Sequence, residues 1–289
     1  MRIGILGLHG MIGTGLAAAL SARGHQIVGT SRAREATPEL RPLLADYHSL
    51  KLGEPADPAW FRNCDAVLYL AHDFSHGANE RNISGTRDWY ASIAAAGVPR
   101  HLFYSSYSAK AGSRSAYGAV KFTLESFFLS QQQWILRPGL VTGKRGLFAF
   151  MAGMVRRLPI LPVPDGGLDP LVLVSLDSVC LATERILRGQ APGEWNLHRP
   201  EMESMREVLQ IMRRVWQRRN ILLPFPTWIP LGLLRLTEFL GIHLAVSADS
   251  LAALRENRKI RRPSHLPLLK IVDPPLEEQI RRLAEEASP

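Results

Sequence analysis

The chain has 289 residues, of which 46% are hydrophobic and 21% charged, a composition typical of a folded globular protein that argues against a disordered chain. Its formal net charge of +9 suits an anionic small molecule, an acidic surface or a nucleic acid, and says nothing about the fold. The two cysteines, Cys64 and Cys180, lie far apart in apolar contexts. We therefore expect buried core residues, no disulfide framework and a cytoplasmic location.

Two stretches bear on export and membranes. A strand is predicted from Arg2 onward, so we expect no secretion signal. The most apolar late stretch, residues 221–246, is interrupted by three prolines and by Arg235 and Glu238, so we expect no transmembrane segment. An interfacial helix that contacts a membrane surface without crossing it is the remaining alternative.

The first 145 residues alternate short apolar runs with helical patterns, which indicates βαβ units on a parallel sheet. The runs are apolar on both faces, as parallel strands covered by helices are. We predict an α/β fold with a Rossmann-type doubly wound sheet. The expected strands are 3–6, 26–30, 66–70, 101–105 and 134–137, and the expected helices are 14–23, 83–96 and 116–130.

In residues 146–289 the alternation of strand and helix patterns ends, and helical patterns separated by prolines dominate. We expect a smaller, mostly helical lobe that binds the substrate. The boundary near residue 145 is soft, because such a lobe often returns a strand to the main sheet, and the run 171–174 is the candidate strand. The expected helices are 147–158, 179–188, 205–219, 230–240, 247–256 and 276–286.

A glycine-rich turn follows the first strand, with the spacing G-x-x-G-x-x-G. Gly7 permits the tight turn, Gly10 lets the backbone approach a pyrophosphate, and Gly13 lets helix and strand pack closely. The following helix directs free N–H groups at the phosphates. Because a strand precedes this turn and a helix follows it, we expect these glycines, with Met11 and Ile12, to bind a dinucleotide.

The end of the second strand indicates which dinucleotide. NAD sites usually place Asp or Glu there, whereas this chain has Thr30-Ser31-Arg32. Arg32 can bind a 2′-phosphate through a charge-assisted contact, and Ser31 can add a hydrogen bond. NADP is therefore the expected cofactor, and NAD is the less favoured alternative.

A Tyr-x-x-x-Lys pair, Tyr117 and Lys121, lies on one face of the expected helix 116–130. A close ammonium favours the phenolate, and bringing a phenol pKa from about 10 to near neutrality needs roughly 4 kcal/mol. Tyr117 could then exchange a proton with a substrate oxygen as hydride moves. Ser105 and Ser106 end the preceding strand, where a hydroxyl would contact the same oxygen.

Together these motifs resemble the short-chain dehydrogenase/reductase superfamily, in its NAD-dependent epimerase/dehydratase-like branch. The resemblance runs from Arg2 to about Gly143 and rests also on residues 64–71, 82–86, 103–106 and 136–139. It implies that Ser106, Tyr117 and Lys121 are catalytic, with the choice between Ser105 and Ser106 left open. It also implies cofactor contacts from Leu70, Ala71, His72, Asn82, Ser105, Tyr117, Lys121, Pro138 and Gly139.

The resemblance is incomplete between the serine and the tyrosine. The segment 107–116 is short and polar, whereas sugar-nucleotide epimerases usually carry a longer insert there. The leading prediction is an NADP-dependent oxidoreductase that moves hydride between the nicotinamide and a carbonyl or alcohol carbon of a small molecule. The alternatives are an epimerase or dehydratase acting on a sugar-like substrate and, in another class, a non-catalytic NADP(H) sensor or accessory subunit. The intact Ser, Tyr and Lys argue against the last.

The charge distribution and the histidine spacing bear on other partners. The late basic residues form either a solvated helix face or a site for an anion, and without interleaved aromatic residues they predict no nucleic-acid partner. The histidines have no metal-ligand spacing, so no metal is expected. The sequence is compatible with a homodimer. The basic residues are Arg213, Arg214, Arg218, Arg219, Arg255, Arg258, Lys259, Arg261 and Arg262.

Overall fold

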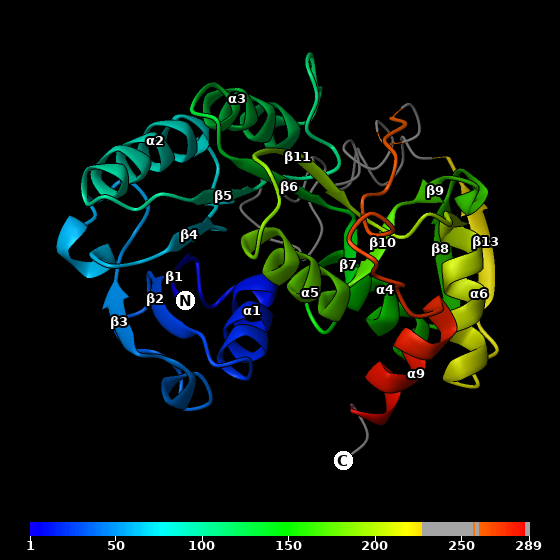
Figure 1. The fold of residues 1–289 in the computed structure, drawn as a ribbon. Helices are drawn as coiled ribbons and strands as arrows, with labels where there is room; N and C mark the ends of the chain where they lie inside the picture. Colours follow the sequence, from blue (N-terminus) through cyan, green and yellow to red (C-terminus); the bar gives the residue numbers. More distant parts are fainter. Residues whose placement is uncertain (227–256, 258–259, 287–289) are drawn as a thin grey trace.

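The computed structural model describes residues 1–226, 257 and 260–286. Its centre is a seven-stranded sheet with the order β11-β6-β5-β4-β1-β2-β3, in which every pairing is parallel (Figure 1). Chain order reverses between β1 and β4, and in such sheets ligands bind beyond the carboxyl ends of the strands at this point. The strands are β1 (Arg2–Leu6), β2 (Gln26–Ser31), β3 (Asp46–Ser49), β4 (Ala66–Tyr69), β5 (His101–Tyr104), β6 (Trp134–Pro138) and β11 (Gly193–Leu197).

Helices cover both faces of this sheet, so its central strands are buried on both sides (Figure 1). One face packs against α1 (Met11–Ser21) and α5 (Leu176–Leu187). The other packs against α2 (Asn79–Ala95) and α3 (Ala116–Ser130), which contribute large aromatic side chains to the core. This arrangement confirms the predicted doubly wound Rossmann-type fold.

Two strands escaped prediction because they lie at the sheet edges. β3 reads Asp-Tyr-His-Ser, and β11 reads Gly-Glu-Trp-Asn-Leu, so neither shows a continuous apolar run. The prediction that residues 171–174 join the main sheet is wrong. β10 (Leu173–Ser175) pairs instead with β7 (Leu140–Thr142) in a separate two-stranded sheet, and β11 is the strand that pairs with β6.

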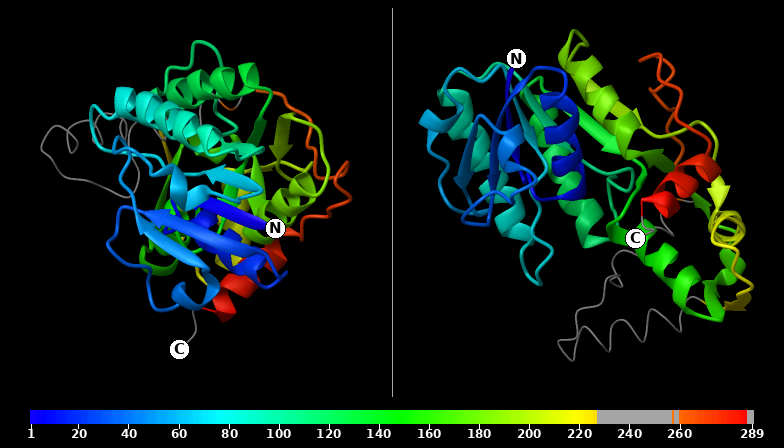
Figure 2. Two further views of the ribbon diagram at one scale, coloured as in Figure 1. Left: turned by 60° about the vertical axis from the view of Figure 1, so that its left-hand side comes forward. Right: turned by 90° about the horizontal axis from the view of Figure 1, so that it is seen from below.

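The second lobe has a core of its own, to which three helices contribute. They are α4 (Gly146–Arg157), α6 (Met205–Val215) and α9 (Leu276–Glu285), which lie together on one side of the molecule (Figures 1 and 2). Two further short strand pairs, which periodicity did not predict, join them: β8 (Ile160–Pro164) with β13 (Ile221–Phe225), and β9 (Pro170–Leu171) with β12 (Glu203–Ser204). The expected helices 230–240 and 247–256 lie outside the described residues.

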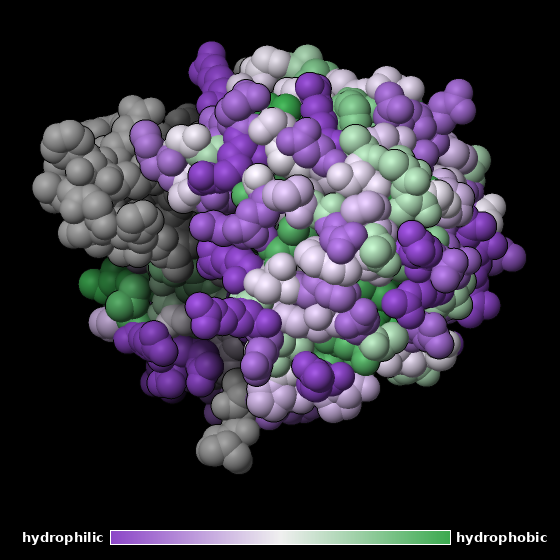
Figure 3. All heavy atoms as spheres, turned by 90° about the vertical axis from the view of Figure 1, so that its left-hand side faces the viewer, coloured by the Kyte–Doolittle hydropathy of each residue, from purple (hydrophilic) through white to green (hydrophobic). Residues whose placement is uncertain are grey.

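The surface on the β3 side is mostly hydrophilic, with small and separated apolar areas (Figure 3). Such scattered apolar residues are normal on a solvent-facing surface. Cys64 and Cys180 are both buried and unbridged, as expected of small core residues. Of the helices that the structure describes, none combines the length and hydropathy needed to cross a membrane.

Candidate functional site

The glycine loop between β1 and α1 fits tightly against its neighbours on all but one side. Gly7 has a φ of +96°, and a Cβ there would lie 2.7 Å from the backbone nitrogen of Ala71. A Cβ at Gly13 would lie 2.5 Å from the carbonyl oxygen of Gly7. Gly10 is exposed, and its added Cβ would meet nothing closer than 3.3 Å. The loop is therefore compact, and it is least crowded at Gly10.

The start of α1 is available to an anion. Gly10 is the N-cap residue, and no side chain caps the helix there. The first N–H groups of the helix, from Met11 and Ile12 onward, therefore have no side-chain acceptor at this end. An uncapped helix start beside a glycine loop is the arrangement that binds phosphate groups in dinucleotide sites.

At the end of β2, Ser31 is engaged within the protein. Its hydroxyl lies 3.0 Å from Nδ1 of His9 and 2.8 Å from the Tyr47 hydroxyl, and it accepts a hydrogen bond from the Ala33 amide. Arg32, in contrast, is exposed, and among the residues described it has no ion-pair partner. The basic side chain at this position is therefore free to meet a ligand, while Ser31 orders the loop beneath it.

The loop after β4 carries Leu70, Ala71 and His72, and Asn82 holds it in place. The Asn82 side chain accepts from the Asp73 amide at 2.8 Å and donates to the Asp73 carbonyl oxygen at 2.8 Å. Asp73 also pairs with Arg81, and hydrogen bonds from Ser75 together with this pair lower the pKa of the Asp73 carboxyl to about 2. Asn82 thus acts on the site through the loop that it fixes.

The two serines after β5 have different surroundings. The Ser105 hydroxyl is buried and has no hydrogen-bond partner among the described residues. The Ser106 hydroxyl lies 2.9 Å from that of Ser108 and is hydrogen-bonded to Tyr117. The structure therefore places Ser106 with the tyrosine, and leaves a buried polar group at Ser105 without a partner.

Tyr117 and Lys121 lie one turn apart on α3, as their spacing predicted. The Lys121 ammonium is buried, lies 5.6 Å from the centre of the Tyr117 ring, and donates to the Tyr104 carbonyl oxygen at 2.8 Å. Burial lowers the pKa of Lys121 to about 7 and raises that of Tyr117 to about 12. The expectation that Lys121 lowers the phenol pKa is therefore not met here, because the desolvated lysine is directed at Tyr104.

An aromatic cluster adjoins the phenol. The His72 ring packs edge-on against Tyr117 with ring centres 4.9 Å apart, and Phe74 stacks on Tyr117 at 5.8 Å. Burial, with a contribution from Lys121, lowers the pKa of His72 to about 3, so the imidazole is neutral. Phe74 is 80% exposed. A neutral aromatic surface therefore flanks the tyrosine, and no sequence motif marked Phe74.

Late residues support the segment that follows the serines. Arg262 donates to the Tyr107 carbonyl oxygen at 2.6 Å and to that of Ala109, and its guanidinium lies 5.6 Å from the Tyr107 ring centre. The Tyr107 amide in turn donates to the Pro138 carbonyl oxygen at 3.3 Å. A Cβ at Gly139 would lie 2.5 Å from the Val172 carbonyl oxygen, so this strand end is closely packed.

Two of the late basic residues that the structure describes have structural partners. Arg214 pairs with Glu277, and Arg262 has the structural contacts just described. Arg255, Arg258 and Lys259 lie outside the described residues. In the described part of the chain, no group of three or more His, Cys, Asp or Glu side chains could hold a metal ion.

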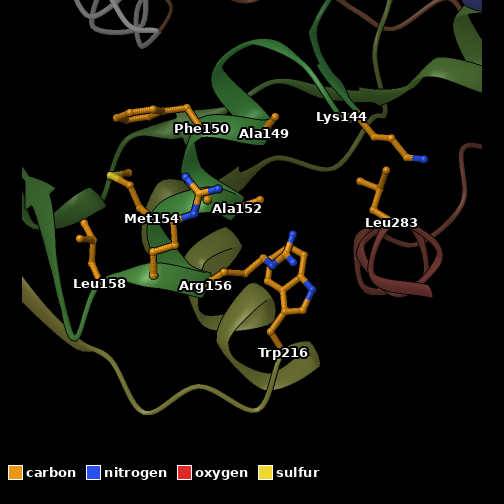
Figure 4. Close-up of a pocket in the computed structure, with 12 residues that line it drawn as sticks. Lys144, Ala149, Phe150, Ala152, Met154, Arg156, Leu158, Trp216 and Leu283 are labelled. Carbon is orange, nitrogen blue, oxygen red and sulfur yellow. The ribbon is translucent and has the colours of Figure 1, made fainter. Parts of the chain in front are cut away.

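A cavity of about 540 Å³ lies in the second lobe, against the outer side of α4 (Figure 4). Phe150, Met154 and Trp216 give it apolar walls, and Arg156 and Arg157 add positive charge. Its lining includes none of the predicted catalytic residues and no member of the glycine loop. The cavity therefore does not enclose the predicted catalytic residues or the glycine loop.

The residues at the carboxyl edge of the sheet fit a dinucleotide on three observations. The loop is open only where Gly10 lacks a side chain, the helix start beside it is uncapped, and two buried hydroxyls, of Thr30 and Ser105, have no partner among the described residues. These hydroxyls end two strands of the sheet, β2 and β5, whose carboxyl ends share one edge. A polar ligand along this edge would satisfy both.

Comparison with known proteins gives one family. The sequence model of the NAD dependent epimerase/dehydratase family matches residues 3–157. Rv2047c of Mycobacterium tuberculosis, described as uncharacterized, is 33% identical over 258 residues, which cover 86% of this chain and 26% of that protein. The chain therefore spans about a quarter of the length of this relative.

Solved structures share the fold. A nucleoside-diphosphate-sugar epimerase from Staphylococcus aureus superposes with a TM-score of 0.76 and 14% identity, covering 97% of this chain and all of that one (100%). TunA, an NAD dependent NDP-hexosamine 5,6-dehydratase of tunicamycin biosynthesis, superposes with a TM-score of 0.72 and 18% identity, covering 99% of this chain and 96% of TunA. Identities this low show the fold alone. From the sequence match, the chain belongs to the NAD dependent epimerase/dehydratase family, whose members are enzymes of the short-chain dehydrogenase/reductase type.

Proposed function

We propose that the protein is an NADP-dependent oxidoreductase that reduces a carbonyl carbon, or oxidises the corresponding alcohol, of a small molecule. The observation that carries this proposal is the hydrogen bond between Ser106 and Tyr117 at the carboxyl edge of the sheet, one helical turn before the buried Lys121. When bound, the cofactor would supply or accept the hydride.

Tyr117 is the proposed proton donor. Its pKa of about 12 keeps the phenol protonated at neutral pH, which is the form that reduction requires. As hydride reaches the carbonyl carbon, the developing negative charge on the oxygen receives the Tyr117 proton, and the Ser106 hydroxyl donates a hydrogen bond to the same oxygen. Reduction therefore needs one proton-transfer group, and the structure has one beside the serine.

Lys121 is proposed to tune this step. Its ammonium is held by the Tyr104 carbonyl oxygen, and its pKa of about 7 makes its charge dependent on pH near neutrality. A charged Lys121 would favour the phenolate that alcohol oxidation requires, because opposite charges in a buried site attract strongly. The pair thus supports both directions, with reduction favoured where the lysine is neutral.

The preference for NADP over NAD rests on Arg32. Its exposed guanidinium follows β2, where a carboxylate would otherwise hold the ribose hydroxyl and repel a 2′-phosphate. Arg32 can instead form a bidentate contact with that phosphate. TunA, which has the same fold, is NAD dependent by its description. The fold therefore does not decide between the two cofactors, and the proposed preference for NADP depends on Arg32.

Epimerisation is the second candidate. Its support is the family match together with the nucleoside-diphosphate-sugar epimerase among the structural neighbours. Epimerisation begins with the reverse of this reduction, in which hydride leaves the alcohol carbon and a proton leaves its hydroxyl oxygen, so it uses the same residues. It differs in its outcome, because hydride returns to the substrate and the nicotinamide shows no net change.

The test uses NADPH with deuterium at the transferring carbon and a panel of quinones, cyclic ketones and nucleotide-linked keto sugars. Reductase activity should place deuterium on the new carbinol carbon, with one NADP⁺ formed per product molecule. Interconversion of an alcohol without net nicotinamide change would favour the epimerase instead. Tight NADPH binding without label transfer to any carbonyl would contradict the proposal and favour a non-catalytic NADP(H) sensor.

A further inference from the structure

We propose that Arg145, the N-cap residue of α4 at the boundary between the Rossmann half and the second lobe, binds the pyrophosphate of the dinucleotide at the glycine loop. This inference rests on the dinucleotide binding proposed above, and it adds a ligand-binding residue from outside the glycine loop. Neither the glycine spacing nor the family resemblance pointed to this residue.

The first observation is contact between the glycine loop and the connection from β7 to α4. Arg145 Nη1 donates a hydrogen bond to the His9 carbonyl oxygen at 2.8 Å, and His9 lies between Gly7 and Gly10 in the loop. Gly143 lies against the start of α1, since a Cβ there would be 2.7 Å from Met11 Sδ. The connection from β7 to α4 is therefore packed against the uncapped end of α1, where phosphates would bind.

The second observation is the available charge. Arg145 is exposed, and among the described residues no carboxylate pairs with it. Its neighbour Lys144 differs, because it pairs with Glu286 at 3.0 Å. The positive charge of Arg145 acts on the loop, where it helps burial to lower the pKa of His9. A full positive charge without a described counter-ion thus stands beside the loop.

The Arg145 guanidinium can bind the His9 carbonyl oxygen and a pyrophosphate at the same time. An arginine has five N–H donors in a planar fork, and the His9 contact uses one of them. The others can bind phosphate oxygens while the contact to His9 keeps the side chain in position. The helix start supplies neutral N–H donors, and Arg145 adds the charge that they lack.

One consequence is coupling between the two lobes. Arg145 is the N-cap residue of α4, which belongs to the core of the second lobe. A pyrophosphate held by both Arg145 and the glycine loop would fix the entry to α4 against the Rossmann half. Cofactor binding would in this way order the lobe that is expected to receive the substrate.

The test measures affinities of NAD⁺, NADP⁺ and ADP-ribose by calorimetry for the wild-type protein and for Arg145→Met, Arg145→Lys and Lys144→Met. All three ligands share the pyrophosphate, so Arg145→Met should weaken each by a similar factor of at least ten. Arg145→Lys should recover part of the loss, since it keeps the charge without the fork. Lys144→Met should change affinity less than threefold, and the unfolding midpoint of each ligand-free variant should stay close to wild type.

Unchanged ADP-ribose affinity in Arg145→Met would overturn the inference. A loss confined to NADP⁺ would also overturn it, because it would place Arg145 at the 2′-phosphate. Equal losses in Lys144→Met would show a general effect of surface charge and contradict a specific contact. If the wild-type protein binds no dinucleotide, the proposed function is wrong. If the wild-type protein binds the dinucleotides and Arg145→Met binds them equally well, only the inference about Arg145 is wrong.

Discussion

The ammonium of Lys121 lies 2.8 Å from the backbone oxygen of Tyr104 and 5.6 Å from the centre of the Tyr117 ring. The lysine is thus anchored to the end of β5, the strand that leads to Ser105 and Ser106. Because both Tyr117 and Lys121 are desolvated, their pKa values move toward the neutral forms, to about 12 and about 7. The site holds a protonated phenol above a lysine whose charge changes near neutral pH.

The buried Lys121 should make folding stability depend on pH. Its folded pKa of about 7 is below the ordinary value of 10.5, so the unfolded chain binds more protons between these values. Stability should therefore rise as pH increases through this window, by up to a few kcal/mol, relative to Lys121→Met. Urea unfolding of both cofactor-free proteins from pH 6 to pH 10 measures the difference. Parallel curves would show that Lys121 stays charged in the folded protein.

Gly10 is the position of the glycine loop where an added side chain disturbs the fold least. Its φ of −69° suits any residue, and the nearest atom to an added Cβ is 3.3 Å away. Gly10→Val should fold and should lose at least tenfold in dinucleotide affinity, or about 1.4 kcal/mol, because the side chain enters the open side of the loop. Gly153→Val, at a position with nothing within 4 Å, is the control. Normal affinity in calorimetry of Gly10→Val would mean that the loop is only a turn.

Arg32 should decide cofactor preference. Arg32→Ala should weaken NADPH binding by roughly 10- to 100-fold, about 1.5–3 kcal/mol, and leave NADH binding nearly unchanged. The matched control is Arg34→Ala, since Arg34 is also exposed and lies two residues away. Fluorescence titrations of the wild-type protein and both variants with NADPH and NADH give the six affinities. Equal weakening of both cofactors, or a wild-type preference for NADH, would remove the assignment to NADP.

A buried ion pair holds α3, the helix that carries Tyr117 and Lys121, to the sheet. Arg137 on β6 makes a bidentate contact with Glu125 on α3, at 2.6 and 2.7 Å, and both residues are buried. Glu125→Gln should lower the free energy of unfolding by about 3–5 kcal/mol, because it leaves Arg137 without its buried partner. Glu194→Gln, which removes the more exposed partner of Arg137, should have the smaller effect. Urea denaturation measures the free energy of unfolding of both variants. Equal losses in Glu125→Gln and Glu194→Gln would contradict the larger contribution assigned to the buried Arg137–Glu125 pair.

The sequence predicted those parts of the fold that periodicity and glycine spacing encode. The buried strands and the helix carrying Tyr117 and Lys121 show these patterns, and the family match confirms the resemblance they indicated. The edge strands β3 and β11 were missed because each has one exposed side and no apolar run. Backbone partners such as the Tyr104 oxygen leave no sequence signal. Contacts across the fold, such as that of Arg262 with Tyr107, depend on tertiary packing that spacing does not show.

The central claim is that Tyr117 transfers a proton during hydride transfer, and one comparison tests it most directly. Wild-type and Tyr117→Phe proteins are assayed for NADPH oxidation with a carbonyl substrate identified by label transfer. The substitution keeps the ring that packs on His72 and Phe74, so folding and NADPH affinity should be unchanged. Turnover should fall at least 10²-fold, the lower end for a positioned general acid. Turnover of the same substrate at the wild-type rate by Tyr117→Phe would contradict the account.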